Sequence, residues 1–303
     1  MTERNAVETP AVSRLDARSG VTESARFLGS GTDRIYAYQY LPASQRGSAV
    51  VMCPAILGDF ASNYRREVVG SRALAARGFA VTRFHYRGAG NSDGSVSDLS
   101  FDSMVEDAMT AADALVAAAG VDDVSFLGTR FGSLVAAAAT RARAARAVAM
   151  WEPMADARSY FREMNRSRMM HEVSGGERQG ATFDDLAADL RANGAADLLG
   201  YTLGRPLFET ALDRTLLGEL GDHTADVLLV QFNLRKGIDK SRQALADALR
   251  AGGCTVDLQA VQGVELWGLH AEGWTPIESR TDVQSLLQIT ADWFSRRAEG
   301  DAA

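Results

Sequence analysis

Short β-rich runs alternate with longer helical patterns along most of this chain, and that alternation limits the folds it can adopt. The runs at 49–53, 79–84, 124–127 and 147–151 have the length and composition of buried strands. Helical patterns separate them, as over 101–119, where apolar residues recur at helical spacing: Phe101, Met104, Ala108, Ala111 and Leu115. This order predicts an α/β fold, a mostly parallel central sheet flanked by crossover helices.

The alternation stops over residues 155–222. This stretch has helical patterns, is rich in Met, Arg and Asp, and is broken by glycines at 175–176 and 194. The earlier order then resumes, with a strand, a helix, a strand and an amphipathic helix at 227–232, 241–251, 256–261 and 283–294. We interpret the middle stretch as a helical cap inserted over the carboxyl ends of the strands.

These patterns predict one core built from two parts of the chain. Residues 21–154 and 223–298 form the core, and 155–222 form the cap. Residues 1–20 are polar without a periodic apolar set and look like a flexible arm, and 299–303 are a short tail. A length of 303 residues with 46% hydrophobic content is enough for such a core.

The composition argues against several classes of partner. A net charge of −7 without a basic block argues against nucleic-acid binding, because phosphates need cationic partners. There is no apolar run of about eighteen residues and no basic start with an apolar core at the N-terminus. Cys53 and Cys254 lie in apolar contexts typical of reduced, packed thiols. We expect a cytoplasmic monomer or homodimer that takes a small-molecule substrate and binds no nucleic acid and no membrane.

No segment has the spacing of a metal or cofactor site. Metal-ligand intervals and a P-loop are absent from the sequence. The run at 88–92 (Gly-Ala-Gly-Asn-Ser) is a turn and not a dinucleotide fingerprint. The sequence therefore implies neither a metal ion nor an organic cofactor.

The most specific motif is a strand–turn–helix segment with two glycines four residues apart. The strand at 124–127 runs into Gly128-Thr129-Arg130-Phe131-Gly132, and a small-residue helix follows over 134–145. In the nucleophile pattern G-x-S-x-G the glycines permit a tight turn that presents the central side chain. Here that side chain is Arg130, a permanently charged guanidinium that does not attack a carbonyl carbon. Acyl-serine chemistry is therefore excluded at this position.

Four stretches together resemble the α/β-hydrolase fold and, more narrowly, the serine-aminopeptidase-like (S33-type) bacterial hydrolases with their exosortase-associated branch. They are Met52-Cys53-Pro54 with Asn63-Tyr64-Arg65-Arg66, the segment 84–92, the arginine elbow, and Met150-Trp151-Glu152-Pro153. The resemblance covers residues 48–154, and the remainder matches in element order alone. Several members of that branch carry arginine at the elbow, which makes Arg130 less of an isolated change.

The chain departs from that family pattern at two further places. His85 stands where an aspartate is usual, and Gly58-Asp59 stand where the branch often has a glutamate. His85 follows a strand and is a candidate pocket residue, although a structural hydrogen bond within the turn at 87–92 is the favoured interpretation. The resemblance therefore implies the fold and a pocket at the carboxyl ends of the strands, but not serine-hydrolase activity.

Two interpretations of Arg130 remain open. As a functional group, it holds a carboxylate, enolate or phosphate, helped by the N-terminus of the helix that starts at Gly132. As a structural group, it pairs with a neighbouring carboxylate such as Glu152 or Asp59 and fills an abandoned site.

The resemblance supplies the other site residues. It implies an oxyanion site made by backbone N–H groups of Phe131 and of the loop residues Ile56 and Leu57. His270 lies after the last strand, where the fold has its catalytic histidine, and Trp267 beside it is a candidate substrate contact.

The acidic partner of His270 is left open between two residues. Glu152 directly follows a strand, and Asp239 lies nearer the usual acid position, although either is equally readable as a helix-cap carboxylate. Glu265 and Glu272 flank His270 and are further candidate bases.

Three functions fit these residues. The first is a lyase: Arg130 holds an anion while His270 removes a proton, so that a carboxylate is eliminated from a small acylated or carbonyl-containing metabolite. Lyases of this fold that act on acylated polyketide intermediates are an analogy for it at the level of fold, and they suggest secondary-metabolite biosynthesis. The second is an esterase or thioesterase in which a base activates water. The third is a non-catalytic protein that keeps the anion pocket.

Overall fold

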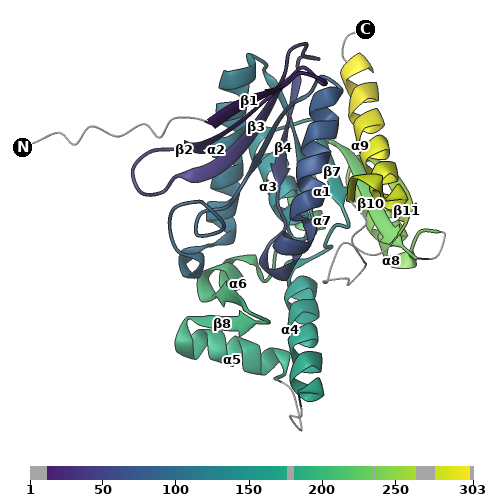
Figure 1. Cartoon of the computed structure of the whole chain (residues 1–303). Coiled ribbons are helices and arrows are strands. Elements are labelled where there is room, and N and C mark those ends of the chain that lie inside the picture. Colours follow the sequence, from purple (N-terminus) through teal and green to yellow (C-terminus); the bar gives the residue numbers. More distant parts are fainter. Residues whose placement is uncertain (1–11, 176–180, 235–236, 264–276, 301–303) are drawn as a thin grey trace, which may run out of the picture.

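The computed structural model describes residues 12–175, 181–234, 237–263 and 277–300, and its centre is a mixed sheet with helices on both faces (Figure 1). Within these residues the sheet has nine strands in the order β1-β2-β3-β5-β4-β6-β7-β10-β11. Their bounds are β1 Val12–Asp16, β2 Val21–Leu28, β3 Ile35–Pro42, β4 Ser48–Cys53, β5 Ala80–Phe84, β6 Asp123–Thr129, β7 Ala147–Trp151, β10 Asp226–Asn233 and β11 Thr255–Gln262.

The strands from β5 to β11 in this order run parallel, and β1, β2 and β3 add an antiparallel edge. Every residue of β4, β5 and β7 is buried. Strands covered on both faces have no side exposed to solvent, so β4 and β7 are mainly apolar runs in the sequence, whereas β5 also buries Thr82 and Arg83. The predicted mostly parallel sheet is confirmed.

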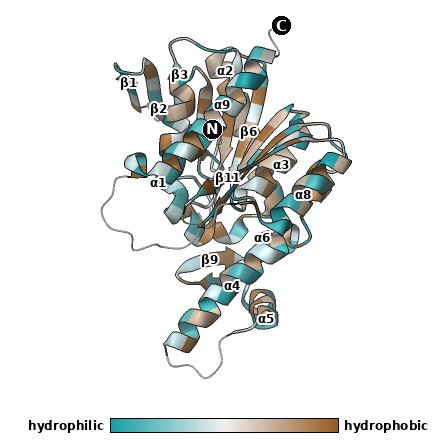
Figure 2. Ribbon diagram, turned by 90° about the vertical axis from the view of Figure 1, so that its right-hand side faces the viewer, coloured by the Kyte–Doolittle hydropathy of each residue, from teal (hydrophilic) through white to brown (hydrophobic). Residues whose placement is uncertain are grey.

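Two layers of helices enclose the sheet. One face carries α1 (Leu57–Ala76) and α9 (Thr281–Gly300), and the other carries α2 (Phe101–Ala119), α3 (Gly132–Arg143) and α8 (Lys240–Ala251). Each layer buries its own apolar cluster against the strands, and hydrophobic colour concentrates in the sheet around β6 (Figure 2). None of the helices that the structure describes is both long and apolar enough to span a membrane.

The cap lies between β7 and β10 in the chain and beyond the carboxyl ends of the strands (Figure 1). It consists of α4 (Ala157–Ser174), α5 (Phe183–Asn193), β8 (Ala195–Leu198), β9 (Tyr201–Gly204) and α6 (Arg205–Ala211). The last helix of this stretch, α7 (Leu216–Leu220), packs instead against α3 and α8 of the core. The hairpin of β8 and β9 corrects our expectation of a wholly helical cap. Leu199 and Gly200 between them have φ of 57° and 86°, and positive φ at both residues is what a tight type I′ turn requires.

The N-terminal segment also differs from the expected arm. β1 pairs antiparallel with β2, from Val12 opposite Ala25 to Asp16 opposite Val21. Its first four residues are exposed, so no alternation of apolar and polar residues marks it in the sequence. Backbone pairing with β2 orders residues 12–16, and the Asp16 carboxylate also accepts from the Arg18 N–H and the Ser19 hydroxyl. Two short 3₁₀ helices, η1 (Val96–Asp98) and η2 (Ile277–Ser279), complete the described elements.

Candidate active site

The predicted strand–turn–helix elbow is present. β6 ends at Thr129, α3 begins at Gly132, and Arg130 between them has φ of 53°. A Cβ added at Gly128 would lie 2.4 Å from the Gly132 carbonyl oxygen, and one added at Gly132 would lie 2.3 Å from the Cys53 carbonyl oxygen. Such distances are far below van der Waals contact, so the close approach of backbone here requires both glycines.

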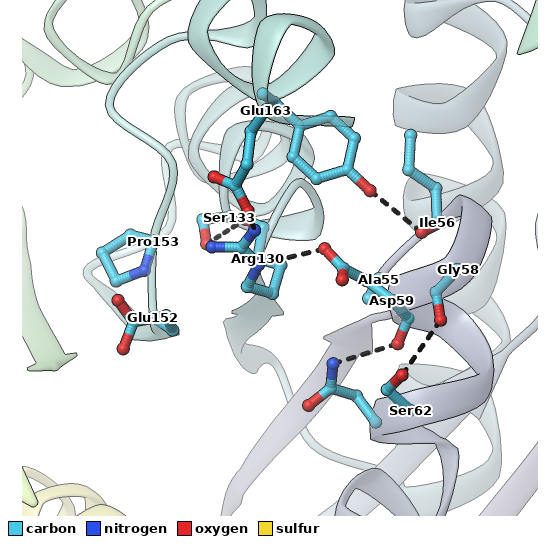
Figure 3. A network of polar contacts seen from close by, with 12 residues as sticks. Ala55, Ile56, Gly58, Asp59, Ser62, Arg130, Ser133, Glu152, Pro153 and Glu163 are labelled. Atoms are coloured by element: carbon cyan, nitrogen blue, oxygen red, sulfur yellow. Dashed lines mark hydrogen bonds and ion pairs between the residues drawn. The ribbon is translucent and has the colours of Figure 1, made fainter. Parts of the chain in front are cut away.

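The Arg130 side chain is enclosed between two carboxylates (Figure 3). Its Nε donates to Asp59 Oδ2 at 3.0 Å, and its Nη2 donates to Glu163 Oε1. The residue is 2% exposed, and its guanidinium carbon lies 5.8 Å from the centre of the Tyr160 ring. Burial disfavours the charge, but Asp59 and Glu163 outweigh it and hold the pKa of Arg130 above its ordinary value.

Asp59 is therefore a partner of Arg130, as one of the two interpretations expected, whereas Glu152 is not. Glu163 was missed. It lies on α4 one turn after Tyr160, on the same stripe of a helix whose buried residues include Ala157 and Phe161. In the sequence, the feature that could have identified Glu163 is a carboxylate on the predominantly buried stripe of a cap helix.

Both partner carboxylates are held in surroundings that disfavour their charge. Burial raises the pKa of Asp59, and the attraction of Arg130 offsets that only in part. Burial also raises the pKa of Glu163, and the nearby charges of Asp59 and Glu152 add to the increase against the opposing effect of Arg130. Asp59 lies in the first turn of α1, where the helix dipole favours negative charge.

Glu152 follows β7 and is joined to the neighbouring strand and helix. Its Oε2 accepts the Phe232 N–H at 2.6 Å, and its Oε1 accepts from Arg242 Nη2 at 3.1 Å. Arg242 also donates to the Pro153 carbonyl oxygen. Burial raises the pKa of Glu152, and Arg242 is the largest opposing influence. Arg242 lies on α8, 90 residues away in the sequence, so no local sequence pattern predicts its contact with Glu152.

Asp239 has a local structural role. It precedes α8, its N–H donates to Gln231 Oε1 at 3.0 Å, and its carboxylate accepts from the side chains of Gln231 and Asn233. It occupies the N-cap position, but its side chain caps no helix N–H. These hydrogen bonds join the end of β10 to the start of α8, and none of them involves Arg130.

His85 belongs to the turn that follows β5, as the favoured interpretation expected. Its Nδ1 accepts the Asn91 N–H at 3.1 Å, and a Cβ on Gly90 would lie 2.3 Å from that atom. The ring contacts four aromatic rings with centroids 5.3 to 6.3 Å away, those of Phe60, Tyr38, Tyr64 and Tyr36. Burial, with the nearby Arg83, lowers the pKa of His85 to about 4, so it is neutral near pH 7.

His270 and Trp267 lie outside the described residues, as do Glu265 and Glu272, and their roles stay predictions. β11, which they follow in the chain, ends at Gln262, in parallel register with β10. The carboxyl ends of parallel strands meet at one edge of a sheet, which is also the edge of Arg130 and Glu152.

The loop after β4 leads directly into α1, and the role of its backbone N–H groups in an oxyanion site stays a prediction. Leu57 opens α1 with φ of 51°, and the Ile56 carbonyl oxygen accepts from the Tyr160 hydroxyl at 3.0 Å. The Phe131 ring is buried against Tyr160 and Phe161 of α4. α1 and α3 thus both begin beside Arg130, and helix N-termini attract anions.

The described side chains next to the elbow include no activated nucleophile. The Ser133 hydroxyl donates to the Arg130 carbonyl oxygen at 2.6 Å. Cys53 is fully buried, and burial raises the pKa of its thiol. Across the same described residues, no three His, Cys, Asp or Glu side chains are grouped to hold a metal ion.

A cavity of about 190 Å³ adjoins this edge of the sheet. Its lining is mainly apolar and comes from the loop at 55–57, the turn after β5, and the cap: Ile56, Leu57, Phe60, Tyr86, Leu99 and Leu207 are among the residues. Larger and more polar hollows, of about 470 and 570 Å³, lie at the amino ends of the strands near Ser48 and Asp123. We assign the smaller cavity to the site because ligands in open α/β sheets bind at the carboxyl ends.

Comparisons with known proteins agree with this architecture. The model of the serine aminopeptidase S33 family matches residues 57–176. Three solved structures are similar over nearly all of the chain. The enzyme Est1E from Butyrivibrio proteoclasticus, in complex with ferulic acid, has 15% identity and a TM-score of 0.64, and covers 90% of this chain and 98% of its own.

Mouse alpha/beta hydrolase domain-containing protein 10 has 15% identity and a TM-score of 0.59, covering 90% of this chain and 99% of its own. Proline iminopeptidase from Mycobacterium smegmatis has 15% identity and a TM-score of 0.59, covering 92% and 100%. At such identities the similarity establishes the fold. No curated protein sequence matches the chain.

Proposed function

The chain has the α/β-hydrolase fold, and from that premise we propose that it is an enzyme that acts on a small acylated carbonyl compound without an acyl-serine intermediate. The reaction we assign is an elimination. A base removes the proton α to the carbonyl, the bond from the β-carbon to the acyloxy oxygen breaks, a carbon–carbon double bond forms, and a carboxylate leaves. No covalent bond to the protein is needed at any step.

One observation carries the proposal: backbone strain is kept at three neighbouring strand ends. Leu57, Arg130 and Glu152 have φ of 51°, 53° and 48°, and they follow β4, β6 and β7. Among the described residues, two other non-glycine residues share positive φ, Ala144 and Leu199. Such a conformation costs roughly 1–3 kcal/mol per residue and persists where function requires it. Strain concentrated around Arg130 supports a working site.

The charges suit the departing carboxylate. Arg130 and the N-termini of α1 and α3 provide positive potential at one point, where negative charge grows as the carbon–oxygen bond breaks. The loop residues Ile56 and Leu57, with Phe131, offer N–H groups to the carbonyl oxygen of the substrate. The neighbouring apolar cavity of about 190 Å³ suits a small apolar group.

The base in this proposal is His270, on the basis of its place in the sequence. Glu152 is the better candidate to orient it, because Glu152 is 6% exposed and ends a strand beside the elbow, whereas Asp239 is bound to Gln231. Each carboxylate oxygen of Glu152 accepts one hydrogen bond from the described residues and has capacity for another.

Substitution of Arg130 tests the assignment. We expect Arg130→Leu to lower the rate of elimination by about 10²–10³, the usual effect of losing one charge-stabilising donor, and Arg130→Lys to lower it less. The matched control is Arg141→Leu, which removes an exposed arginine of α3 that pairs with Asp222. A fluorophosphonate probe should label no serine, and labelling would support an ordinary hydrolase instead.

The double ion pair of Arg130 favours a second candidate, a non-catalytic protein in which those pairs fill the pocket. A guanidinium 2% exposed and held by two carboxylates is a common structural arrangement. In that case Arg130→Leu lowers the melting temperature, and no acyloxy carbonyl compound is turned over by the parent protein.

A further inference from the structure

We propose that Glu163 occupies an anion-binding position at Arg130 and is displaced from it by a ligand. This position then binds the carboxylate of a small organic acid or of a substrate that carries one. The inference rests on the proposed function and names the ligand class of the same site. It also assigns α4 of the cap a role in opening that site.

The two partners of Arg130 differ in how firmly they are enclosed. The Asp59 side chain is 2% exposed and comes from the first turn of α1, within the core. The Glu163 side chain is 29% exposed and comes from the cap (Figure 3). Solvent reaches part of the Glu163 side chain, whereas the Arg130 side chain that it covers is 3% exposed. Asp59 is the permanent partner, and Glu163 is the one that an incoming carboxylate meets.

Charge balance favours exchange over addition. One guanidinium already serves two carboxylates, and a third anion would place three negative charges around one positive charge. Replacing Glu163 by a ligand carboxylate keeps the count unchanged and gives Arg130 the same kind of acceptor. The N-termini of α1 and α3 remain to favour the anion.

The groups around Glu163 weaken its ion pair with Arg130. The charged and titratable groups that act on it are Arg130 from the elbow, Asp59 from α1 and Glu152 after β7, and Tyr160 is its neighbour on α4. Of these only Arg130 attracts its charge. Burial and the two carboxylates raise the pKa of Glu163, so it takes up a proton at a higher pH than an ordinary glutamate. A protonated Glu163 no longer competes as an anion.

The test is calorimetric titration of the full-length protein with butyrate, using butyramide as the uncharged match. We expect Glu163→Gln to bind butyrate about tenfold more tightly than the parent protein, because the competing charge is gone while the shape is kept. Glu172→Gln on the same helix is the control, since Glu172 pairs with Arg168 at 2.7 Å. It should bind as the parent does, and butyramide should bind to none of them.

Two results overturn the inference. One is equal affinity of Glu163→Gln and the parent protein for butyrate. The other is a gain in affinity that survives when Arg130→Leu is added to Glu163→Gln, because the anion then sits elsewhere.

A second measurement covers the case in which Glu163→Gln does not fold. Propanesulfonate stays ionised at every pH used, so its affinity for the parent protein should rise as the pH falls and Glu163 is protonated. A flat profile contradicts the exchange. Neither measurement involves turnover, so the exchange and the elimination reaction stand or fall separately.

Discussion

At the scale of single residues, the site is governed by what burial does to charge. Arg130 stays charged because two carboxylates surround it, whereas Asp59, Glu163 and Glu152 all have pKa values raised by burial. A carboxylate in that condition is easier to protonate or to displace than one at the surface. The chemistry available at the elbow therefore follows from desolvation as much as from the arginine.

Burial also raises the pKa of Glu67, and at this residue the consequence for the stability of the protein is measurable. It lies on α1, is fully buried, and accepts the Ala55 N–H at 3.1 Å. Burial, opposed by Arg83, raises its pKa from 4.5 to about 7. The folded protein thus holds this proton to a higher pH than the unfolded chain does. Its contribution to the free energy of unfolding is complete below about pH 4.5 and is lost as the pH rises to about 7.

We predict that Glu67→Gln removes this pH dependence. The amide keeps an acceptor for the Ala55 N–H but does not ionise. The free energy of unfolding of the variant, relative to that of the parent protein, therefore increases by about 3 kcal/mol between acidic and neutral pH. Urea unfolding at several pH values, as the difference between variant and parent, gives the measurement. A difference that does not change with pH would show that the pKa of Glu67 is the same in the folded and unfolded states.

At the scale of elements, the sequence predicts those whose patterns are local. β4, β6 and β7 are recognisable because strands buried on both faces are mainly apolar, and the elbow is recognisable because only glycine fits at Gly128 and Gly132. β1 was not recognised, since its side chains are exposed. The β8–β9 hairpin was missed because its turn uses Leu199 before the glycine instead of the usual asparagine.

That turn makes a prediction for the cap. Leu199 has φ of 57° and is 44% exposed, so it adopts a conformation that disfavours leucine and buries little surface in return. We expect Leu199→Asn to raise the stability of the protein by roughly 1 kcal/mol, visible as a higher melting temperature.

Leu217→Asn is the matched control for it. Leu217 is 43% exposed but lies in the helix α7, where asparagine is a poorer helix former than leucine. The control should be neutral or destabilising. Equal effects of the two substitutions would argue against the strained turn.

At the scale of the whole molecule, the fold determines where chemistry can occur but not which chemistry. The sequence was sufficient to predict the parallel sheet, and the predicted place of the site follows from the edge at which its strands end. The partners of Arg130 were only partly predictable. Glu163 lies 33 residues from Arg130 and belongs to the cap, and its place on the buried stripe of α4 does not reveal which core residue it contacts.

Isotope labelling during turnover tests the central claim most directly. A β-acyloxy ketone is turned over in water enriched in ¹⁸O, and the released carboxylic acid is analysed by mass spectrometry, with the uncatalysed reaction subtracted. Elimination breaks the bond on the alkyl side of the ester oxygen. Both oxygens of the released acid then come from the substrate, so we expect an unlabelled acid together with an unsaturated ketone. One ¹⁸O atom per acid molecule would mean that water attacks the acyl carbon, and it would rule out elimination.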